Sequence, residues 1–223
     1  DPAHSASLGL DLAEPLEPIA TAVVVPEEEH ALSGALLAAK HTLIRPILIG
    51  ERDRIEEVAA AIGADLSGIE IIDLHGHNMA AARAVELFHE GRAQAIMKGH
   101  LHTGQLLQHI VKSDGGLRTS SRISHVFVMD VPGLDHLLMV TDAAINIAPT
   151  LEEKVDIAQN AIDLAIALGI DTPKVGVLSA VETVNPKIPS TIDAAVLSKM
   201  AERGQIRGGL VDGPLAMDNA VDV

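Results

Sequence analysis

The chain has 223 residues and a formal net charge of −15, from 16 Lys and Arg against 31 Asp and Glu. Such an acidic chain argues against nucleic acid and anionic membrane surfaces as partners. It has no cysteine, which excludes disulfides, thiolate metal sites and a cysteine nucleophile, and fits a cytoplasmic location.

Four short apolar runs alternate with helical patterns over the first part of the chain. They are bounded by Pro, Gly or charged residues, as buried strands usually are, and occupy residues 18–26, 45–50, 68–74 and 93–99. Gly63 and Gly91 end two of the intervening helices. Strands and helices that alternate at this spacing predict parallel sheets joined by right-handed crossovers.

The second part of the chain begins with two apolar runs, at 124–132 and 136–142, which are expected to pair as an antiparallel hairpin. A long helix follows, which Thr150 and Glu153 start as a capping box and Gly169 ends. The last predicted elements are a strand at 173–179, a helix at 190–203 with Ser190 and Asp193 as its capping pair, and a strand at 208–214.

These elements predict an α/β fold with two domains. We expect a tail or linker at 1–18, a first α/β domain at 19–140, and a second at 141–223 that is incomplete at its C-terminal end. The acidic start of the chain has neither the basic nor the apolar segment of a signal peptide. The first residue is Asp1 and not Met, so we expect the chain to be a piece of a longer polypeptide.

The stretch MKGHLHTG, at 97–104, joins a predicted strand to a helix. In open α/β sheets, ligands bind at the carboxyl ends of strands and against helix N-termini. Glycine permits close backbone approach and lysine supplies charge, so an anion site is expected at Lys98, Gly99, His102 and Thr103. An ordinary strand-to-helix loop with an exposed lysine gives the same pattern.

Residues 91–129 form a basic segment within the acidic chain. It holds five Lys and Arg and one Asp, a charge of +5 − 1 = +4, so the rest of the chain carries −15 − 4 = −19. This contrast indicates an anionic ligand held by several side chains. A solvated face that balances nearby acids has the same composition.

Two histidine pairs, HGH at 75–77 and HLH at 100–102, resemble metal-binding pairs. Neither has a carboxylate at ligand spacing, so we expect no metal site. His102 can instead orient a phosphate or carbonyl oxygen.

Polar residues also follow the later strands. Asp142 and Asn146 lie at a strand end beside the expected domain boundary, among small alanines. Glu182 and Asp212 are placed in the loops after the next two strands. All four are expected to face a cleft, although residues of these types also satisfy loop backbone groups.

Four segments of the chain closely resemble the phosphate acetyltransferase/phosphate butyryltransferase family: MKGHLHT, TDAAINIAP, LGIDTPKVGVLSAVETVNPKIPST and LVDGPLAMDNA. The resemblance is greatest to the acyltransferase portion of bifunctional enoyl-CoA hydratase/phosphate acetyltransferase proteins. It implies a three-layer α/β/α fold of the isocitrate/isopropylmalate dehydrogenase type, with two domains, mostly parallel sheets and a cleft between them. It also implies a homodimer, and an upstream hydratase domain as a further partner.

The same resemblance implies reversible transfer of a short acyl group, acetyl or butyryl, between CoA and inorganic phosphate. CoA is then a substrate, with no bound cofactor and no metal. Lys98 and Thr103 become candidates for stabilising anionic charge, Arg118 and Arg122 for holding the phosphates of CoA. Asp142 and Asn146, in TDAAINIAP, are expected to line the cleft.

The chain departs from the family pattern in two places. A late Ser-Arg…Asp motif, which in the family binds phosphate and supplies the general base, is absent from these residues. The base is therefore unassigned, with Asp142 as the first candidate. Other acetyltransferases of the family have Ser-Gly where this chain has Lys98–Gly99.

Two other functions fit parts of the pattern. One is a metal-dependent dehydrogenase of the same architecture that uses His100 or His102. The other is a non-catalytic module for CoA binding or dimerisation, because the late motif is missing.

Overall fold

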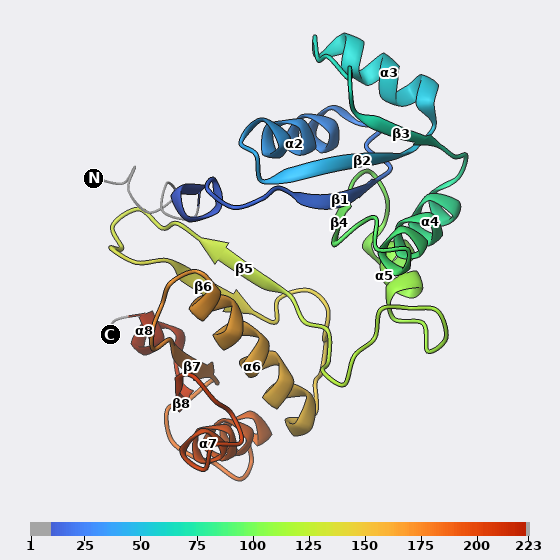
Figure 1. The fold of residues 1–223 in the computed structure, drawn as a ribbon. Helices are drawn as coiled ribbons and strands as arrows, with labels where there is room; N and C mark the ends of the chain where they lie inside the picture. The colour runs from blue at the N-terminus through green and yellow to red at the C-terminus, as the bar shows by residue number, and fades with distance from the viewer. Residues whose placement is uncertain (1–9, 222–223) are drawn as a thin grey trace. The chain divides into compact units, whose positions relative to one another are not determined.

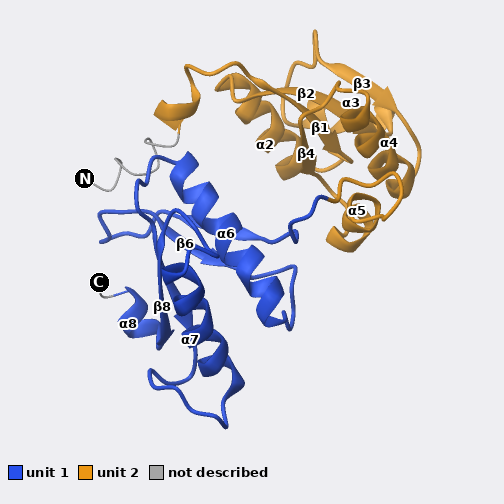
Figure 2. Ribbon diagram, turned by 60° about the horizontal axis from the view of Figure 1, so that its bottom comes forward, with its two compact units in different colours: residues 1–6, 119–223 blue, residues 7–118 orange. Residues whose placement is uncertain are grey.

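The structure is a computed structural model that describes residues 10–221, so residues 1–9 of the predicted tail lie outside the described residues. The described chain forms two compact units, one that ends at Arg118 and one that begins at Thr119 (Figure 2). The sequence placed this boundary near residue 140. It falls earlier because the predicted hairpin at 124–142 packs against the long helix that follows it.

The unit that ends at Arg118 contains a four-stranded parallel sheet in the order β3-β2-β1-β4 (Figure 1). Its residues 10–13 form one helical turn before the first strand. Its further elements are β1 (Ile19–Val24), α2 (Glu29–Lys40), β2 (Ile44–Gly50), α3 (Arg52–Ala61), β3 (Glu70–Asp73), α4 (His77–His89), β4 (Ala95–Lys98) and α5 (Thr103–Ile110).

Apolar side chains cover both faces of this sheet. On one face, Val24, Ile47 and Ile49 pack against α4 and α5. On the other, Val23 and Leu48 pack against α2 and α3. Successive residues of a strand point to opposite faces, so a continuous apolar run is what two covering layers require. The result is the three-layer α/β/α arrangement expected from the sequence.

The unit that begins at Thr119 contains two small sheets. β5 and β6 pair as the predicted antiparallel hairpin, with Val126 opposite Thr141, and β7 pairs with β8 in parallel. A core cluster around Ile162 joins α6 and α7 to β7 and β8. The elements are β5 (Val126–Met129), β6 (Leu138–Thr141), α6 (Leu151–Ala167), β7 (Lys174–Leu178), α7 (Pro189–Glu202), β8 (Leu210–Leu215) and α8 (Met217–Val221).

The two long helices of this unit begin in different ways. α6 has the predicted capping box, in which the Thr150 hydroxyl accepts from Glu153 N and the Glu153 carboxylate accepts from Thr150 N. The predicted capping pair of α7 is wrong. Its N-cap is Ile188, whose side chain makes no capping hydrogen bond, and the helix begins at Pro189 instead.

Ser190 and Asp193 do not cap α7 because tertiary contacts use their side chains. Ser190 Oγ lies 2.8 Å from Ser179 Oγ, and the Asp193 carboxylate accepts from Lys154 Nζ of α6 at 2.7 Å. Among residues 10–221, no helix is long and apolar enough to cross a membrane.

Candidate functional site

The loops after β1 and β4 lie together at the carboxyl edge of the four-stranded sheet. The chain leaves β1 toward β2 on one side and returns to β4 on the other, so β1 and β4 flank the point where the strand order reverses. Two backbone bonds continue their pairing past the strand ends, from Gly99 N to Val24 O (2.8 Å) and from His100 N to Val25 O (2.7 Å). A reversal point of this kind is where open α/β sheets bind ligands.

Gly99 makes this close approach possible. A Cβ at this position would lie 2.3 Å from the carbonyl oxygen of Val25 and 2.4 Å from that of Val24. Both obstacles are backbone atoms of the neighbouring segment, which cannot rotate away as a side chain would. The position therefore requires glycine. The sequence suggested a close backbone approach at this residue, and the backbone that approaches it is the end of β1 and Val25, within the same unit.

Lys98 shapes the loop that follows it. Its ammonium donates to the carbonyl oxygens of Leu101 (2.8 Å) and Gly99 (3.2 Å), which uses two of its three N–H donors. α5 then begins at Thr103, with His102 as its N-cap, and His102 N donates to Gln105 Oε1 at 3.3 Å. The structure thus brings Lys98, Gly99, His102 and Thr103 together in one loop and the first turn of one helix.

Two carboxylates after β1 were not singled out from the sequence. Glu27 has a side chain that is only 6% exposed, and its Oε1 accepts from Glu51 N at 2.8 Å. Glu28 caps α2, and the N–H of His30 lowers its pKa, with smaller effects from Ala31 and from the nearby His100. Their position could have indicated them, because both closely follow the first predicted strand.

In the unit that begins at Thr119, Asp142 organises the loop between β6 and α6. Its Oδ1 accepts from Ala144 N (3.1 Å) and Ile145 N (3.0 Å), and its Oδ2 accepts from the backbone and side-chain amides of Asn146. Burial acts to raise the pKa of Asp142, but these four donors outweigh it, so the pKa lies below its ordinary value. Such a carboxylate stays ionised and hydrogen-bonded, which suits an anchor for the loop.

Arg122 joins this loop to the start of α6. Its Nε donates to Asn146 Oδ1 at 2.9 Å, and its Nη1 lies 2.7 Å from Glu153 Oε1. Its backbone N–H donates to Asp156 Oδ2 at 2.8 Å. Arg118 belongs to the other unit, so the basic segment predicted at 91–129 is divided between the two units.

The two remaining candidates lie apart from this network. Glu182 is exposed in the segment between β7 and α7. Asp212 was expected in a loop after the last strand, and this is wrong: it lies within β8, opposite Gly176, and accepts from Gly213 N. The predicted strand at 208–214 in fact already contained Asp212, and β8 ends one residue later, at Leu215, which lies opposite Leu178.

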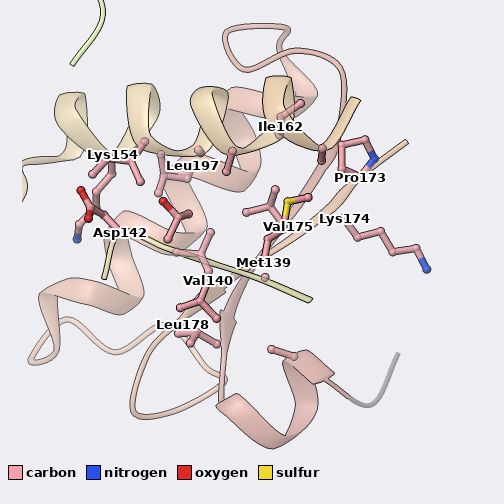
Figure 3. A pocket seen from close by; sticks show the side chains of 18 of the residues that line it. Met139, Val140, Asp142, Lys154, Ile162, Pro173, Lys174, Val175, Leu178 and Leu197 are labelled. Carbon is pink, nitrogen blue, oxygen red and sulfur yellow. The ribbon is translucent and has the colours of Figure 1, made fainter. Parts of the chain in front are cut away.

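Asp142 and Asn146 also line a cavity of about 440 Å³ within the same unit (Figure 3). Most of its wall is apolar and comes from β6, β7 and one face of α6, with Lys154 as a further polar group. Ile147, in the same loop as Asp142, is completely exposed. The expected cleft residues Glu182 and Asp212 do not line this cavity.

The histidines of the described part of the chain do not assemble with acids into a metal-binding cluster. Within residues 10–221, no group of three or more His, Asp or Glu side chains has the geometry to hold a metal ion. His75 Nδ1 lies 3.7 Å from Glu51 Oε2, which is an ion pair when the imidazole is protonated.

Solved structures share this arrangement of helices and sheets. A branched-chain phosphotransacylase from Enterococcus faecalis V583 superposes with a TM-score of 0.72 at 26% sequence identity, covering 92% of this chain and 71% of that one. A phosphotransacetylase from Streptococcus pyogenes gives a TM-score of 0.75 at 20% identity, covering 96% and 73%. The chain therefore has the α/β/α fold found in phosphotransacylases.

Sequence comparison identifies the family. Residues 77–223 match the phosphate acetyl/butaryl transferase family, and the chain belongs to it. It is 56% identical over 205 residues to the phosphate acetyltransferase of Rhizobium meliloti, covering 92% of this chain. It is 44% identical over 200 residues to the phosphate butyryltransferase of Clostridium acetobutylicum. The chain spans 65% of the length of the first relative and 66% of the second.

Proposed function

We propose that this chain takes part in the reversible transfer of a short acyl group, acetyl or butyryl, between CoA and inorganic phosphate. The observation that carries the proposal is the 56% identity to a phosphate acetyltransferase over nearly the whole chain. A loop suited to an anion, at the strand-order reversal beside β4, supports it from the structure.

The reaction makes a limited set of chemical demands. A phosphate oxygen attacks the thioester carbonyl carbon, a C–O bond forms, the C–S bond breaks, and the CoA sulfur leaves as a thiolate that takes up a proton. Charge that develops on the carbonyl oxygen needs hydrogen-bond donors, and in the reverse direction a base must remove the thiol proton.

The residues between β4 and α5 suit the anionic part of this work. Lys98 keeps one N–H donor beyond the two that hold the loop, and the first turn of α5, at Thr103, offers backbone N–H groups. His102 and Gly99 lie in the same segment. We also propose that Arg118 and Arg122 contact the phosphates of CoA; Arg122 already contacts Glu153 and Asn146.

Asp142 was the first candidate for the general base, and its contacts favour another role. A base near neutral pH needs a pKa close to the working pH, whereas four donors hold the pKa of Asp142 below its ordinary value. We therefore propose that Asp142 fixes the loop that carries Asn146, and the base stays unassigned.

A thiol-release assay tests the proposal. CoA appearance would be measured with a thiol reagent after acetyl-, propionyl- or butyryl-CoA is mixed with phosphate, on residues 1–223 and on any longer natural form. Phosphate-dependent release of CoA is expected, and the ranking of the three substrates gives the acyl preference. Binding of CoA without turnover by every form would contradict an acyltransferase and support a non-catalytic CoA-binding module.

The proposal further includes CoA as a diffusible substrate, no bound cofactor or metal, a cytoplasmic location and a homodimer. We expect a chelator to leave both the melting temperature and CoA binding unchanged. A loss of either after dialysis against chelator, together with NAD turnover, would favour a metal-dependent dehydrogenase. Light scattering at several concentrations would test the homodimer.

A further inference from the structure

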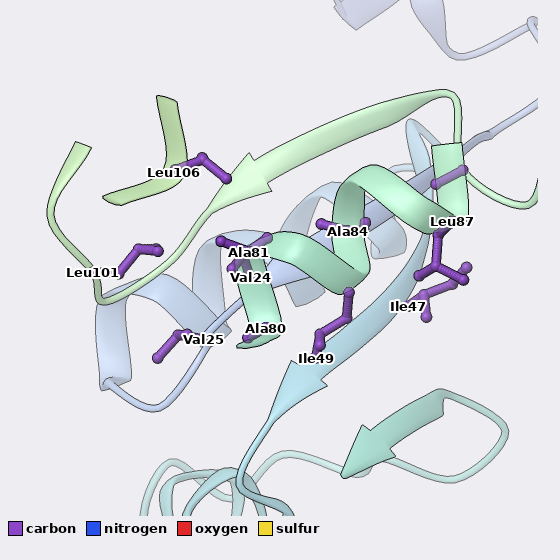
Figure 4. Packing of buried hydrophobic residues seen from close by; sticks show 12 residues of the cluster. Val24, Val25, Ile47, Ile49, Ala80, Ala81, Ala84, Leu87, Leu101 and Leu106 are labelled. Atoms are coloured by element: carbon purple, nitrogen blue, oxygen red, sulfur yellow. The ribbon is translucent and has the colours of Figure 1, made fainter. Parts of the chain in front are cut away.

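The turn after β1 has a backbone conformation that is rare for its residue types. Val25 has a φ of +56°, although branched side chains seldom adopt positive φ and the residue before a proline is normally extended. Neighbours on both sides hold it there: Val25 N donates to Ile49 O at 2.8 Å, and Val25 O accepts from His100 N at 2.7 Å. Its side chain, 1% exposed, belongs to the same apolar cluster as Leu101 (Figure 4). A conformation of this kind persists only where its surroundings enforce it.

Glu27 follows this turn, and its carboxylate occupies a niche at the start of α3. The side chain is only 6% exposed, its Oε1 accepts from Glu51 N at 2.8 Å, and its Oε2 lies 3.9 Å from Arg54 Nη1. Gly50 leaves the room for it, because a Cβ there would lie 2.7 Å from Glu27 Oε1. Burying a carboxylate carries a desolvation cost that an exposed acid at a helix start would not incur. The niche therefore indicates that the position of this carboxylate matters beyond the stability of α3.

A short and stiff piece of backbone connects this carboxylate to the candidate anion loop, the segment from Lys98 to Thr103. Only Pro26 separates Glu27 from Val25, and the proline ring fixes φ at that residue. The carbonyl oxygen of Val25 in turn accepts from His100 N in the loop. A displacement of Glu27 is thus passed to an acceptor on which the loop depends.

We propose that Glu27 is a positioning residue for the candidate anion loop. It acts through the backbone: the carboxylate holds the turn after β1, and the carbonyl groups of that turn hold Gly99 and His100. Lys98, whose ammonium donates to Gly99 O, is placed by the same contacts. For the identity of the anion, inorganic phosphate, the inference rests on the proposed function.

Amide hydrogen exchange, measured by NMR on residues 1–223, tests the geometry without any measurement of activity. Glu27→Ala removes the acceptor of Glu51 N and frees the turn. The amides of Gly99 and His100 should then exchange about tenfold faster, while those in the middle of β2 keep the rates of the parent protein.

Asp73→Ala is the matched control, because Asp73 Oδ1 accepts from Arg52 N at 3.0 Å and so supports the same helix start from β3. It should leave the two loop amides unchanged. Glu27→Gln, whose amide oxygen can replace Oε1 as the acceptor, should keep the exchange rates of the parent. If Glu27→Ala does not fold, Glu27→Asp, which is shorter by one methylene group, takes its place. Equal acceleration by Asp73→Ala, or unchanged exchange of the loop amides in the alanine or aspartate variant, would overturn the proposal.

The phosphate affinity of the same variants tests the consequence for binding. The dissociation constant of inorganic phosphate, from calorimetric titration of residues 1–223, and the KM for phosphate in a longer natural form should both rise about tenfold in Glu27→Ala. Both should stay near the parent values in Glu27→Gln and Asp73→Ala. Partial unfolding alone would lower kcat and leave the KM unchanged, and that result would refute a positioning role. If loop exchange changes as expected but no parent form releases CoA with phosphate, the proposed function fails while the anchor of the loop stands.

Discussion

Replacing Gly99 with alanine should damage the candidate anion loop through backbone crowding alone. The added Cβ would lie 2.3 Å from Val25 O and 2.4 Å from Val24 O, whereas real Cβ atoms essentially never come within 3.0 Å of such neighbours. The loop must therefore move by at least 3.0 − 2.3 = 0.7 Å. The bonds from Gly99 N to Val24 O and from His100 N to Val25 O, at 2.8 and 2.7 Å, would then exceed normal hydrogen-bond length.

The expected magnitude follows from these two effects. Two hydrogen bonds at about 0.5–1.5 kcal/mol each, plus about 1–3 kcal/mol of overpacking strain, give a loss of about 2–6 kcal/mol in the free energy of unfolding. Urea unfolding followed by circular dichroism would measure it. CoA and phosphate affinity of the folded fraction should fall as well, because Lys98 and the start of α5 move with the loop.

Gly104→Ala provides the matched control in the same segment. Gly104 lies in the first turn of α5, and a Cβ there would meet nothing within 4 Å. Alanine is the better helix former by up to about 1 kcal/mol, so this variant should be as stable as the parent or slightly more so. If Gly99→Ala unfolds at the same urea concentration as Gly104→Ala, the argument from close approach is refuted.

Three further predictions concern charged side chains. The depressed pKa of Asp142 contributes stability that is present above the unfolded value of about 3.9 and is lost as pH falls through the folded pKa. The Asp142→Asn variant should therefore be less stable at pH 7, and its free energy of unfolding in urea should change less with pH below about pH 4. Parallel curves of unfolding free energy against pH for the two proteins would contradict this. Lys98→Ala should raise the KM for phosphate by about 10–150-fold, because a charge-assisted contact contributes roughly 1.5–3 kcal/mol. The control Lys112→Ala should change this KM little. An equal effect of the two substitutions would contradict the prediction. Lys154 and Asp193, bonded at 2.7 Å between α6 and α7, should show a coupling of about 0.5–1 kcal/mol in a double-mutant cycle of unfolding, and strict additivity would rule the coupling out.

The elements that sequence predicted best are those with strong local signals. β1 and β2 appear as continuous apolar runs because both faces of the sheet are covered, as Figure 4 shows for Val24, Ile47 and Ile49 beside the alanines of α4. The start of α6 was predictable because its capping box lies within four residues. The predicted strand-to-helix loop at Lys98 was likewise found where the two elements meet.

What the sequence missed depends on contacts between distant residues. Ser190 and Asp193 are residue types that often cap helices. Their side chains instead form hydrogen bonds with residues 11 and 39 positions away in the sequence. The hydrogen bonds from the Lys98 ammonium to the carbonyl oxygens of Gly99 and Leu101 were not predicted either, because the positions of these carbonyls depend on the conformation of the loop. The link from Arg122 to Asn146 spans 24 residues, which no local pattern reveals.

The separate cores of the two units make the chain a convenient system for locating a bound molecule. The clusters on either face of β1 and β2 share no residue with the cluster around Ile162, so each unit can melt in its own step. A ligand held by one unit raises only that step, by mass action. These 223 residues contain neither Trp nor Tyr, so a single Trp introduced into one core would fluoresce without background from them. Two such probes, one at Leu48 and one at Ile162, would tell which unit phosphate engages and which engages CoA.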